Sequence, residues 1–257
     1  MATQPIIDRP HKSAIPRRLA WLSVILLVIA ALLVAAAGPA YRTDMLGLGE
    51  AFSLLRYATY SVVAAAAVGL ITLLASALKR RFGPGFTAVL VIVAAAAILY
   101  VPWQHWQRAQ AVPAIHDITT DMDNPPAFEA VSSAREAAPN EVDYPGEDTA
   151  RQQRAAYPEV QPLPLDAPTS TVLAAVQAEM QEAGWQIVDV SQDRIEATAT
   201  TRWFGFKDDV VVRLGEEDGA TRVDMRSASR LGKSDVGTNA ARVDSFLKAL
   251  KARLAQS

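Results

Sequence analysis

Three long apolar runs in the first half of the chain constrain its fold more than any other feature. Residues 19–37, 57–78 and 86–101 contain no Asp, Glu, Lys or Arg. Each run is close to the roughly 20 apolar residues that a helix needs to cross a bilayer. The sequence therefore predicts a three-helix membrane anchor over residues 19–106.

Tyr100, Trp103 and Trp106 extend the third run into the membrane interface, where aromatic side chains concentrate. The first run could also be a secretory signal peptide, because Arg17 and Arg18 precede it and it ends in small residues. It is long for such a signal and two further runs follow, so a retained helix is favoured. The lack of ionisable residues inside the runs favours a packing anchor over a transport path.

The basic residues of this half predict the orientation of the anchor. Ten Lys and Arg accompany three acids before residue 113, and most lie before the first run or between the second and third. Cytoplasmic segments carry the excess of Lys and Arg, so both clusters are expected in the cytoplasm. We expect an integral protein of a bacterial inner membrane, with residues 1–18 as a cytoplasmic tail and a C-terminal domain in the periplasm.

The half that follows the anchor is acidic. Beyond residue 112, 24 acidic residues outnumber 15 basic ones. A net negative domain argues against nucleic-acid binding, because phosphate contacts need a basic footprint. The chain has no Cys, which excludes disulfides, thiol catalysis and Cys-ligated zinc.

Residues 107–165 predict an extended, proline-rich connector. Eight prolines between residues 124 and 168 argue against regular elements there, and only residues 113–123 have the pattern of a short strand. His116, Asp117, Asp121 and Asp123 could ligate a metal, but their spacing matches no established motif, and turn-forming acids are the simpler interpretation. We therefore expect no metal and no cofactor. Apolar residues favour a strap packed over the folded domain: Phe128, Tyr144, Tyr157 and Leu165.

Residues 166–257 predict an α+β domain. Helical periodicity covers residues 166–184 and 238–255, and β-rich or alternating runs cover 185–190, 193–203, 207–214 and 220–230. Short connections make these four strands an antiparallel meander. Two helices on one face of the sheet give a two-layer sandwich in the order α-ββββ-α.

Alternation along the strands assigns their side chains to two faces. The helix-covered face is expected to receive Ile195, Ala197, Ala199, Trp203, Val210, Val212, Leu214, Val223 and Met225. The opposite face receives three acidic residues and seven basic ones, namely Arg194, Arg202, Lys207, Arg213, Arg222, Arg226 and Arg230. This cationic face is either solvated, with its charges paired across strands, or part of an anion site.

The anion hypothesis places a site where the fourth strand leads into the last helix. Unpaired N–H groups at a helix start, flanked by arginines, favour an anionic ligand. The candidate ligand-binding residues are Arg226, Ser229, Arg230, Lys233, Ser234, Asn239 and Arg242. Asp235 competes with such a ligand, because as a helix cap it would accept the same N–H groups.

His116, Asp208, Asp209 and Asp235 are secondary candidates for a hydrolase-like enzyme, with Arg230 stabilising charge. No recognised nucleophile, metalloprotease or nucleotide motif supports catalysis, so no catalytic residue is assigned. Adjacent strand residues point to opposite faces, so Asp208 and Asp209 cannot act as a dyad unless a bulge intervenes.

Several segments resemble one family. They are His116-Asp-Ile-Thr-Thr-Asp121 with Pro125-Pro126-Ala-Phe128, Phe204-Gly-Phe-Lys-Asp-Asp-Val-Val-Val-Arg213, and Arg226-Ser-Ala-Ser-Arg-Leu-Gly-Lys-Ser-Asp-Val-Gly-Thr-Asn-Ala-Ala-Arg242. Over roughly residues 113–255 the chain resembles the domain-of-unknown-function family numbered 1499. The resemblance implies a family often found in bacterial membrane-attached proteins, and it brings no established catalytic residues.

The sequence leaves three classes of function open. The favoured one is a membrane-anchored binding module for an anionic small molecule, a lipid headgroup or an envelope protein. The alternatives are a hydrolase-like enzyme of the cell envelope and a structural assembly factor. Binding is favoured over catalysis because the basic loop has a physical rationale as an anion site, whereas no catalytic motif is present.

Overall fold

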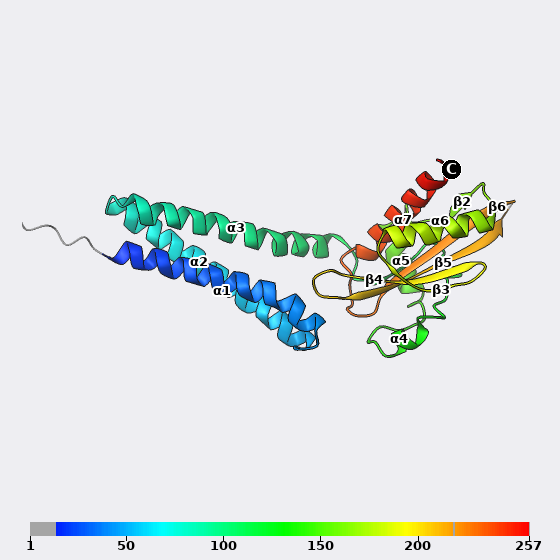
Figure 1. Cartoon of the computed structure of the whole chain (residues 1–257), viewed down its shortest axis with the longest axis horizontal. Coiled ribbons are helices and arrows are strands. Elements are labelled where there is room, and N and C mark those ends of the chain that lie inside the picture. Colours follow the sequence, from blue (N-terminus) through cyan, green and yellow to red (C-terminus); the bar gives the residue numbers. More distant parts are fainter. Residues whose placement is uncertain (1–13, 218, 257) are drawn as a thin grey trace, which may run out of the picture. The chain divides into compact units, whose positions relative to one another are not determined.

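The computed structural model describes residues 14–217 and 219–256 (Figure 1). The expected cytoplasmic tail over residues 1–18 therefore lies mostly outside the described residues. So do Arg9 and Lys12, two of the basic residues before the first apolar run. The described residues form two compact units, with the boundary between Trp103 and Gln104.

The first unit contains helices α1 (Ile15–Arg42) and α2 (Leu48–Leu78) and most of α3 (Phe82–Ala111). All three are long and apolar enough to cross a membrane, which confirms the expected three-helix architecture. Each helix is longer than its apolar run because the helical pattern continues into flanking polar residues. Small residues allow the helices to approach closely, and Ala30 and Ala95 pack with Val62 in a buried cluster.

The second unit is built on one antiparallel sheet of six strands. In the order β1-β6-β5-β4-β3 each strand pairs with its neighbour, and β2 also pairs with β6. The bounds are β1 (Asp117–Thr119), β2 (Leu163–Leu165), β3 (Gln186–Val190), β4 (Arg194–Thr200), β5 (Lys207–Glu217) and β6 (Ala220–Ser229). The α+β class and the antiparallel sheet agree with the sequence prediction.

Helices α6 (Thr169–Glu182) and α7 (Thr238–Leu254) cover one face of this sheet (Figure 1). Gly184, at a φ of 71° that favours glycine, follows the end of α6. Apolar residues of both helices pack on the inward residues of the strands, including Val176, Met180, Ile195, Val212, Met225, Val243 and Leu250. This cluster is the main hydrophobic core of the second unit.

The opposite face is covered by residues 120–146, which we call the strap. The strap contains the short helix α4 (Ser132–Glu136), which lies on the other side of the sheet from α6 and α7 (Figure 1). Phe128 and Val131 of the strap pack on Val211 and Ala228 of the sheet in a second buried cluster. The sheet is therefore enclosed on both faces.

Two expectations need correction. Residues 124–168 are not wholly extended, because α4, α5 (Glu147–Ala156) and β2 lie within them; Gln153 of α5 forms hydrogen bonds with both backbone groups of Thr119. Trp203 is not on the helix-covered face. β4 ends at Thr200, before the strand pattern would bring Trp203 inward, so this side chain lies in the β4–β5 loop and is 42% exposed.

Candidate functional site

The expected site residues gather at one end of the sheet, where β5 begins and β6 ends. Asp208 and Asp209 open β5 in register with Ser229 and Ala228 at the end of β6. As expected from strand alternation, the two aspartates contact different sets of partners on opposite faces. The end therefore holds two separate polar clusters, one under the strap and one under α7.

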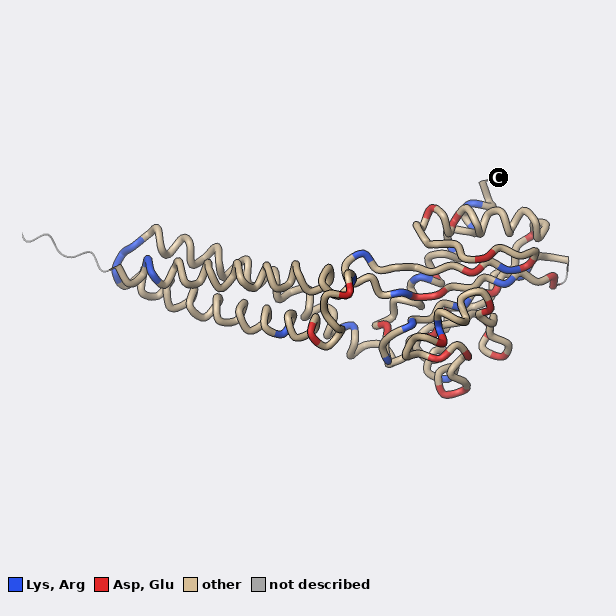
Figure 2. Tube along the Cα trace, turned by 60° about the horizontal axis from the view of Figure 1, so that its bottom comes forward, with Lys and Arg blue, Asp and Glu red and all other residues tan. Residues whose placement is uncertain are grey.

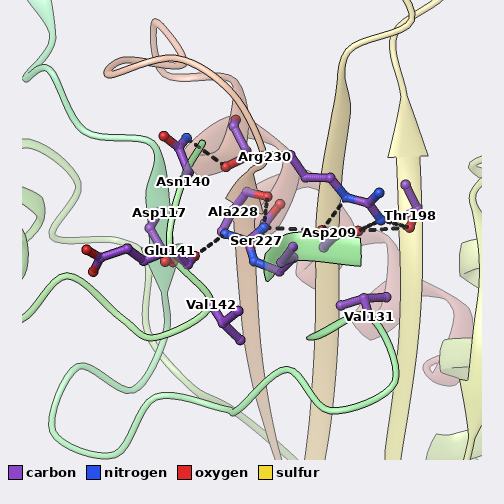
Figure 3. Close-up of polar contacts among 12 residues, drawn as sticks. Asp117, Val131, Asn140, Glu141, Val142, Thr198, Asp209, Ser227, Ala228 and Arg230 are labelled. Atoms are coloured by element: carbon purple, nitrogen blue, oxygen red, sulfur yellow. Dashed lines mark hydrogen bonds and ion pairs between the residues drawn. The ribbon is translucent and has the colours of Figure 1, made fainter. Parts of the chain in front are cut away.

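Asp209 is the centre of the strap-side cluster, and its carboxylate is fully buried. Arg230 donates to both of its oxygens, from Nε at 2.8 Å and Nη2 at 2.7 Å (Figure 3). Thr198 Oγ1 donates at 2.8 Å, and Arg135 Nη1 donates at 3.2 Å from α4. Four donors thus satisfy one buried carboxylate, as a buried charge requires.

The two arginines of this cluster occupy different environments. The hydrogen bond to Asp209 raises the pKa of Arg230, whose side chain remains 17% exposed. Burial lowers the pKa of Arg135, whose side chain has no exposed surface and also donates to the carbonyls of Ala228 and Glu141. Arg135 therefore joins the strap to the sheet, while Arg230 lies at the margin of the strap.

Arg226 is also committed to the strap. Its guanidinium donates to both oxygens of Asp117, at 3.0 and 2.8 Å, and to the carbonyls of Pro126 and Val142. It lies 4.5 Å from the ring centroid of Phe128, within the range of a cation–π contact. Much of the expected cationic face is therefore covered and paired. Its arginines other than Arg202 form ion pairs with carboxylates of the strap, of β1 or of the sheet itself, namely Arg194, Arg213, Arg222, Arg226 and Arg230.

On the helix side, Asp208 pairs with Arg242 of α7 at 2.6 Å. Arg242 also donates to Ser227 Oγ at 3.0 Å and to the side-chain oxygen of Asn239. Asn239 in turn donates to Ser229 Oγ and to the carbonyl of His116, both at 3.0 Å. These polar side chains fix α7 to the sheet and to the start of β1.

The loop from Arg230 to the start of α7 binds its own carboxylate. Asp235 accepts hydrogen bonds from the N–H groups of Gly237 at 2.8 Å and Asn239 at 2.7 Å. Burial raises the pKa of Asp235, although these donors act in the opposite direction. Asp235 therefore occupies the N–H groups at the helix start, where an anionic ligand was predicted to bind.

The structure does not bring all the expected ligand-binding residues together. Arg226 and Arg230 lie on the strap side, whereas Ser229, Asn239 and Arg242 lie on the helix side, so the sheet separates them. Ser234 accepts a hydrogen bond from the N–H of Val236 at 3.2 Å, and Lys233 is exposed in the loop. Of the expected ligand-binding residues, Lys233 is the one that the structure leaves exposed.

The secondary candidates do not form one pocket either. Asp208 and Asp209 are on opposite faces, and the half-buried His116 contributes its backbone carbonyl to the helix-side cluster. Asp117 and Asp121, considered above as metal ligands, form ion pairs with arginines of β5 and β6. Within residues 14–217 and 219–256 there is no group of three His, Cys, Asp or Glu that could hold a metal ion.

Sequence reasoning missed two residues that hold the strap, Arg135 and Glu196. The carboxylate of Glu196 is fully buried and accepts the N–H groups of Glu129 at 2.9 Å and Val131 at 3.0 Å. A signal was present in Val211 and Ala228, which are apolar residues on the face that was expected to be polar. Such residues indicate that something covers that face.

Exposed cations remain at this end of the domain, outside both clusters. Arg202 lies in the β4–β5 loop and Lys207 directly follows this loop. Lys233 lies three residues after Arg230, whose N–H donates to the carbonyl of Lys207 at 3.0 Å. Elsewhere in the second unit, basic and acidic residues alternate along the strands and the strap (Figure 2). Arg202, Lys207 and Lys233 are thus three exposed cations at this end of the sheet.

The fold defines an α+β domain with a strapped antiparallel sheet, in a chain whose three preceding helices could each cross a membrane. The chain belongs to the family described as protein of unknown function DUF1499, whose model matches residues 117–250. The match begins with β1 and ends in α7, so the family unit includes the strap. No curated protein matches the chain.

Proposed function

We propose that this protein is a membrane-anchored binding module whose domain lies outside the cytoplasm and binds an anionic, phosphate-bearing ligand. The observation that supports the proposal most directly is the exposed set of Arg202, Lys207 and Lys233 at one end of an otherwise acidic domain. Charged side chains held on adjacent loops attract and orient an anion, and a charge-assisted contact contributes more than a neutral one.

The basic residues of the first unit support an extracytoplasmic domain. The helices α1 and α2 run in opposite directions (Figure 1). Arg17 and Arg18 at the start of α1 and residues 79–81 after α2 therefore lie at the same end of this unit. An excess of Lys and Arg marks the cytoplasmic end. The end of α3 then emerges on the opposite side, which in a bacterial inner membrane is the periplasm.

An enzyme of the cell envelope is the weaker alternative. Asp208, Asp209 and Arg230 are held by partners within the protein, and a general base or nucleophile must instead reach a substrate. Binding at the exposed cations requires no rearrangement of these clusters.

A titration with inorganic phosphate tests the proposal. The full chain in phosphatidylcholine nanodiscs is titrated with phosphate or glycerol phosphate and followed by calorimetry. Losing one charge-assisted contact is worth roughly 1.5–3 kcal/mol, so Lys207→Glu and Lys233→Glu should each weaken binding by about tenfold or more. Lys251→Glu, an exposed cation in the last turn of α7, is the matched control.

Equal affinities for the control and for both loop variants would contradict the proposal. Comparing phosphatidylglycerol with phosphatidylcholine nanodiscs identifies the source of the phosphate. If the ligand is an anionic lipid headgroup, free phosphate should bind more weakly in phosphatidylglycerol than in phosphatidylcholine nanodiscs, whereas equal affinities would favour a soluble ligand.

A fusion experiment tests the orientation separately. A reporter fused after Trp106 should be active only if it is one that works outside the cytoplasm. Activity of a cytoplasmic reporter at that position, in an intact chain, would contradict the proposed topology.

A further inference from the structure

The loop between β4 and β5, residues 201–206, presents aromatic side chains on a rigid frame. Its ends are joined by hydrogen bonds from Thr201 N to Phe206 O at 2.9 Å and from Phe206 N to Thr201 Oγ1 at 2.8 Å. The ring of Phe204 stacks on Phe206 with centroids 4.9 Å apart, and Trp203 meets Phe204 edge to face at the same distance. The indole of Trp203 therefore has a fixed support.

Trp203 is the more exposed of the two tryptophans that follow α3, Trp185 and Trp203. Trp185 stacks on Phe246 of α7, with centroids 5.2 Å apart, whereas Trp203 is 42% exposed. Among the described residues beyond 112, the other large apolar side chains with comparable exposure are Val188 and Val190 of the edge strand β3. Single exposed apolar residues are common, so exposure alone does not assign a role to Trp203.

The position of the loop in the domain supplies the second observation. The chain enters the sheet at His116, whose carbonyl accepts the N–H of Ser229 at the end of β6. Lys207, at the base of the aromatic loop, lies on the next strand and accepts the N–H of Arg230. Two strand spacings of about 4.8 Å separate the entry point from the loop base, so both are at the same end of the sheet.

The tether that leads to this end is short. α3 ends at Ala111 and β1 begins at Asp117, and an extended chain over this interval reaches at most about 20 Å. The C-terminal part of α3 carries exposed Tyr100, Trp103 and Trp106, which mark a membrane interface in a spanning helix. The tether therefore keeps the entry end of the domain within reach of a lipid surface.

We propose that the aromatic loop docks on the bilayer that the anchor crosses, with Trp203 inserted at the level of the lipid headgroups. Tryptophan prefers this interface because its ring is apolar and its N–H can still bind water or headgroup oxygens. Arg202, next to Trp203 in the loop, and Lys207, at the end of the loop, contact lipid phosphates with their long side chains. This inference rests on the proposed function, since it takes the same cationic end as the binding end and names lipid as the partner.

The absence of cysteine from the chain makes a direct depth measurement possible. Trp203→Cys carries an environment-sensitive fluorophore in the full chain, reconstituted in phosphatidylcholine nanodiscs with and without headgroup-linked quencher lipids. Glu216→Cys is the matched control, because Glu216 is exposed in the same strand β5 but close to its opposite end. We expect blue-shifted emission and severalfold stronger quenching at 203 than at 216.

Equal quenching at the two positions would overturn the inference. A blue shift at 203 without lipid quenching would also overturn it, since the label would then be buried against protein. If Trp203→Cys does not fold, Arg202→Cys is labelled instead, and the same two outcomes apply. Docking is read from the quenching of a label at residue 203 by lipid, and anion binding from the calorimetric titration with phosphate, so either proposal can fail while the other survives.

Discussion

Arg230 shows that a charged side chain at this end of the sheet is paired within the protein. The side chain is at the margin of the strap, yet its Nε and Nη2 groups are both occupied by the buried carboxylate of Asp209. Removing one partner of such a pair leaves a buried charge poorly compensated. A residue expected to bind a ligand therefore has a structural role that can be measured without one.

We predict that Arg230→Ala destabilises the domain by about 3 kcal/mol. This is the lower part of the range for breaking a buried pair, because Arg135 and Thr198 still donate to Asp209. Denaturant unfolding of the full chain, followed by near-UV circular dichroism, measures the loss. Lys207→Ala, an exposed neighbour, should change stability by about 0.5 kcal/mol or less. Similar losses for both variants would contradict this role for Arg230.

Asp235 makes stability depend on pH. Burial raises its pKa above the ordinary 3.8, so as pH rises past 3.8 the unfolded chain releases this proton before the folded one does. Stability therefore falls with pH across that window and levels off above the folded pKa. Asp235→Asn stays neutral and keeps one acceptor for the helix N–H groups, so it lacks this fall.

We predict that the Tm of the unaltered chain, relative to Asp235→Asn, declines as pH rises from below 3.8 through the raised pKa. Differential scanning fluorimetry of both chains over the acid range measures this difference. A Tm difference that is independent of pH, or that grows in favour of Asp235 as pH rises, would show that burial does not control this carboxyl group.

At the scale of elements, the strap is the distinctive part of the domain. Three buried charged residues hold it: Glu196 binds two of its N–H groups, Arg226 binds two of its carbonyls, and Arg135 of the strap pairs with Asp209. Because these contacts are polar and directional, they determine where the strap lies on the sheet as well as how strongly it is held.

We predict that Glu196→Gln loosens the strap. Glutamine keeps one acceptor oxygen and places a donor group where the second N–H needs an acceptor, at a cost of roughly 1–3 kcal/mol. Limited proteolysis with mass spectrometry should show faster cleavage within residues 120–146. Glu217→Gln removes an exposed charge from β5 and serves as the control. Equal cleavage of both variants would mean that Glu196 does not hold the strap.

At the scale of the whole molecule, the second unit has its own core, and the strap and the first two strands belong to it. β1 and β2 both pair with β6, and Phe128 and Val131 enclose the face opposite to the helices. A folding unit that starts at residue 166 would lack all of these parts.

We predict that residues 104–257 fold in isolation, whereas residues 166–257 do not. The shorter chain loses Asp117 and Arg135, which leaves Arg226 without its carboxylate partner and exposes the apolar surface around Val211. Losing the burial of several apolar side chains, at about 1.5–3 kcal/mol each, removes a large part of a typical domain's stability. Solubility and thermal melting of the two fragments measure the difference. A cooperative melt of the shorter fragment would contradict the prediction.

Local patterns predicted much of this molecule. The lengths of the three apolar runs predicted α1, α2 and α3, and alternation along β4, β5 and β6 separated Asp208 from Asp209. The last helix was predicted by one apolar stripe that includes Val243 and Leu250. Such features are readable because helical and strand periods depend on residues that are close in sequence.

The covering of the second face was decided by tertiary structure. Asp117 and Arg226 are 109 residues apart in sequence, and Glu196 binds N–H groups 65 and 67 residues away. A charged residue in a strand has the same local pattern whether water or a strap lies above it. The sequence by itself thus determined the three helices long enough to cross a membrane, the strands other than β2 and the alternation of their faces. Only tertiary contacts decided that the arginines expected to bind a ligand pair with the protein's own carboxylates, since pairing depends on which distant segment packs there.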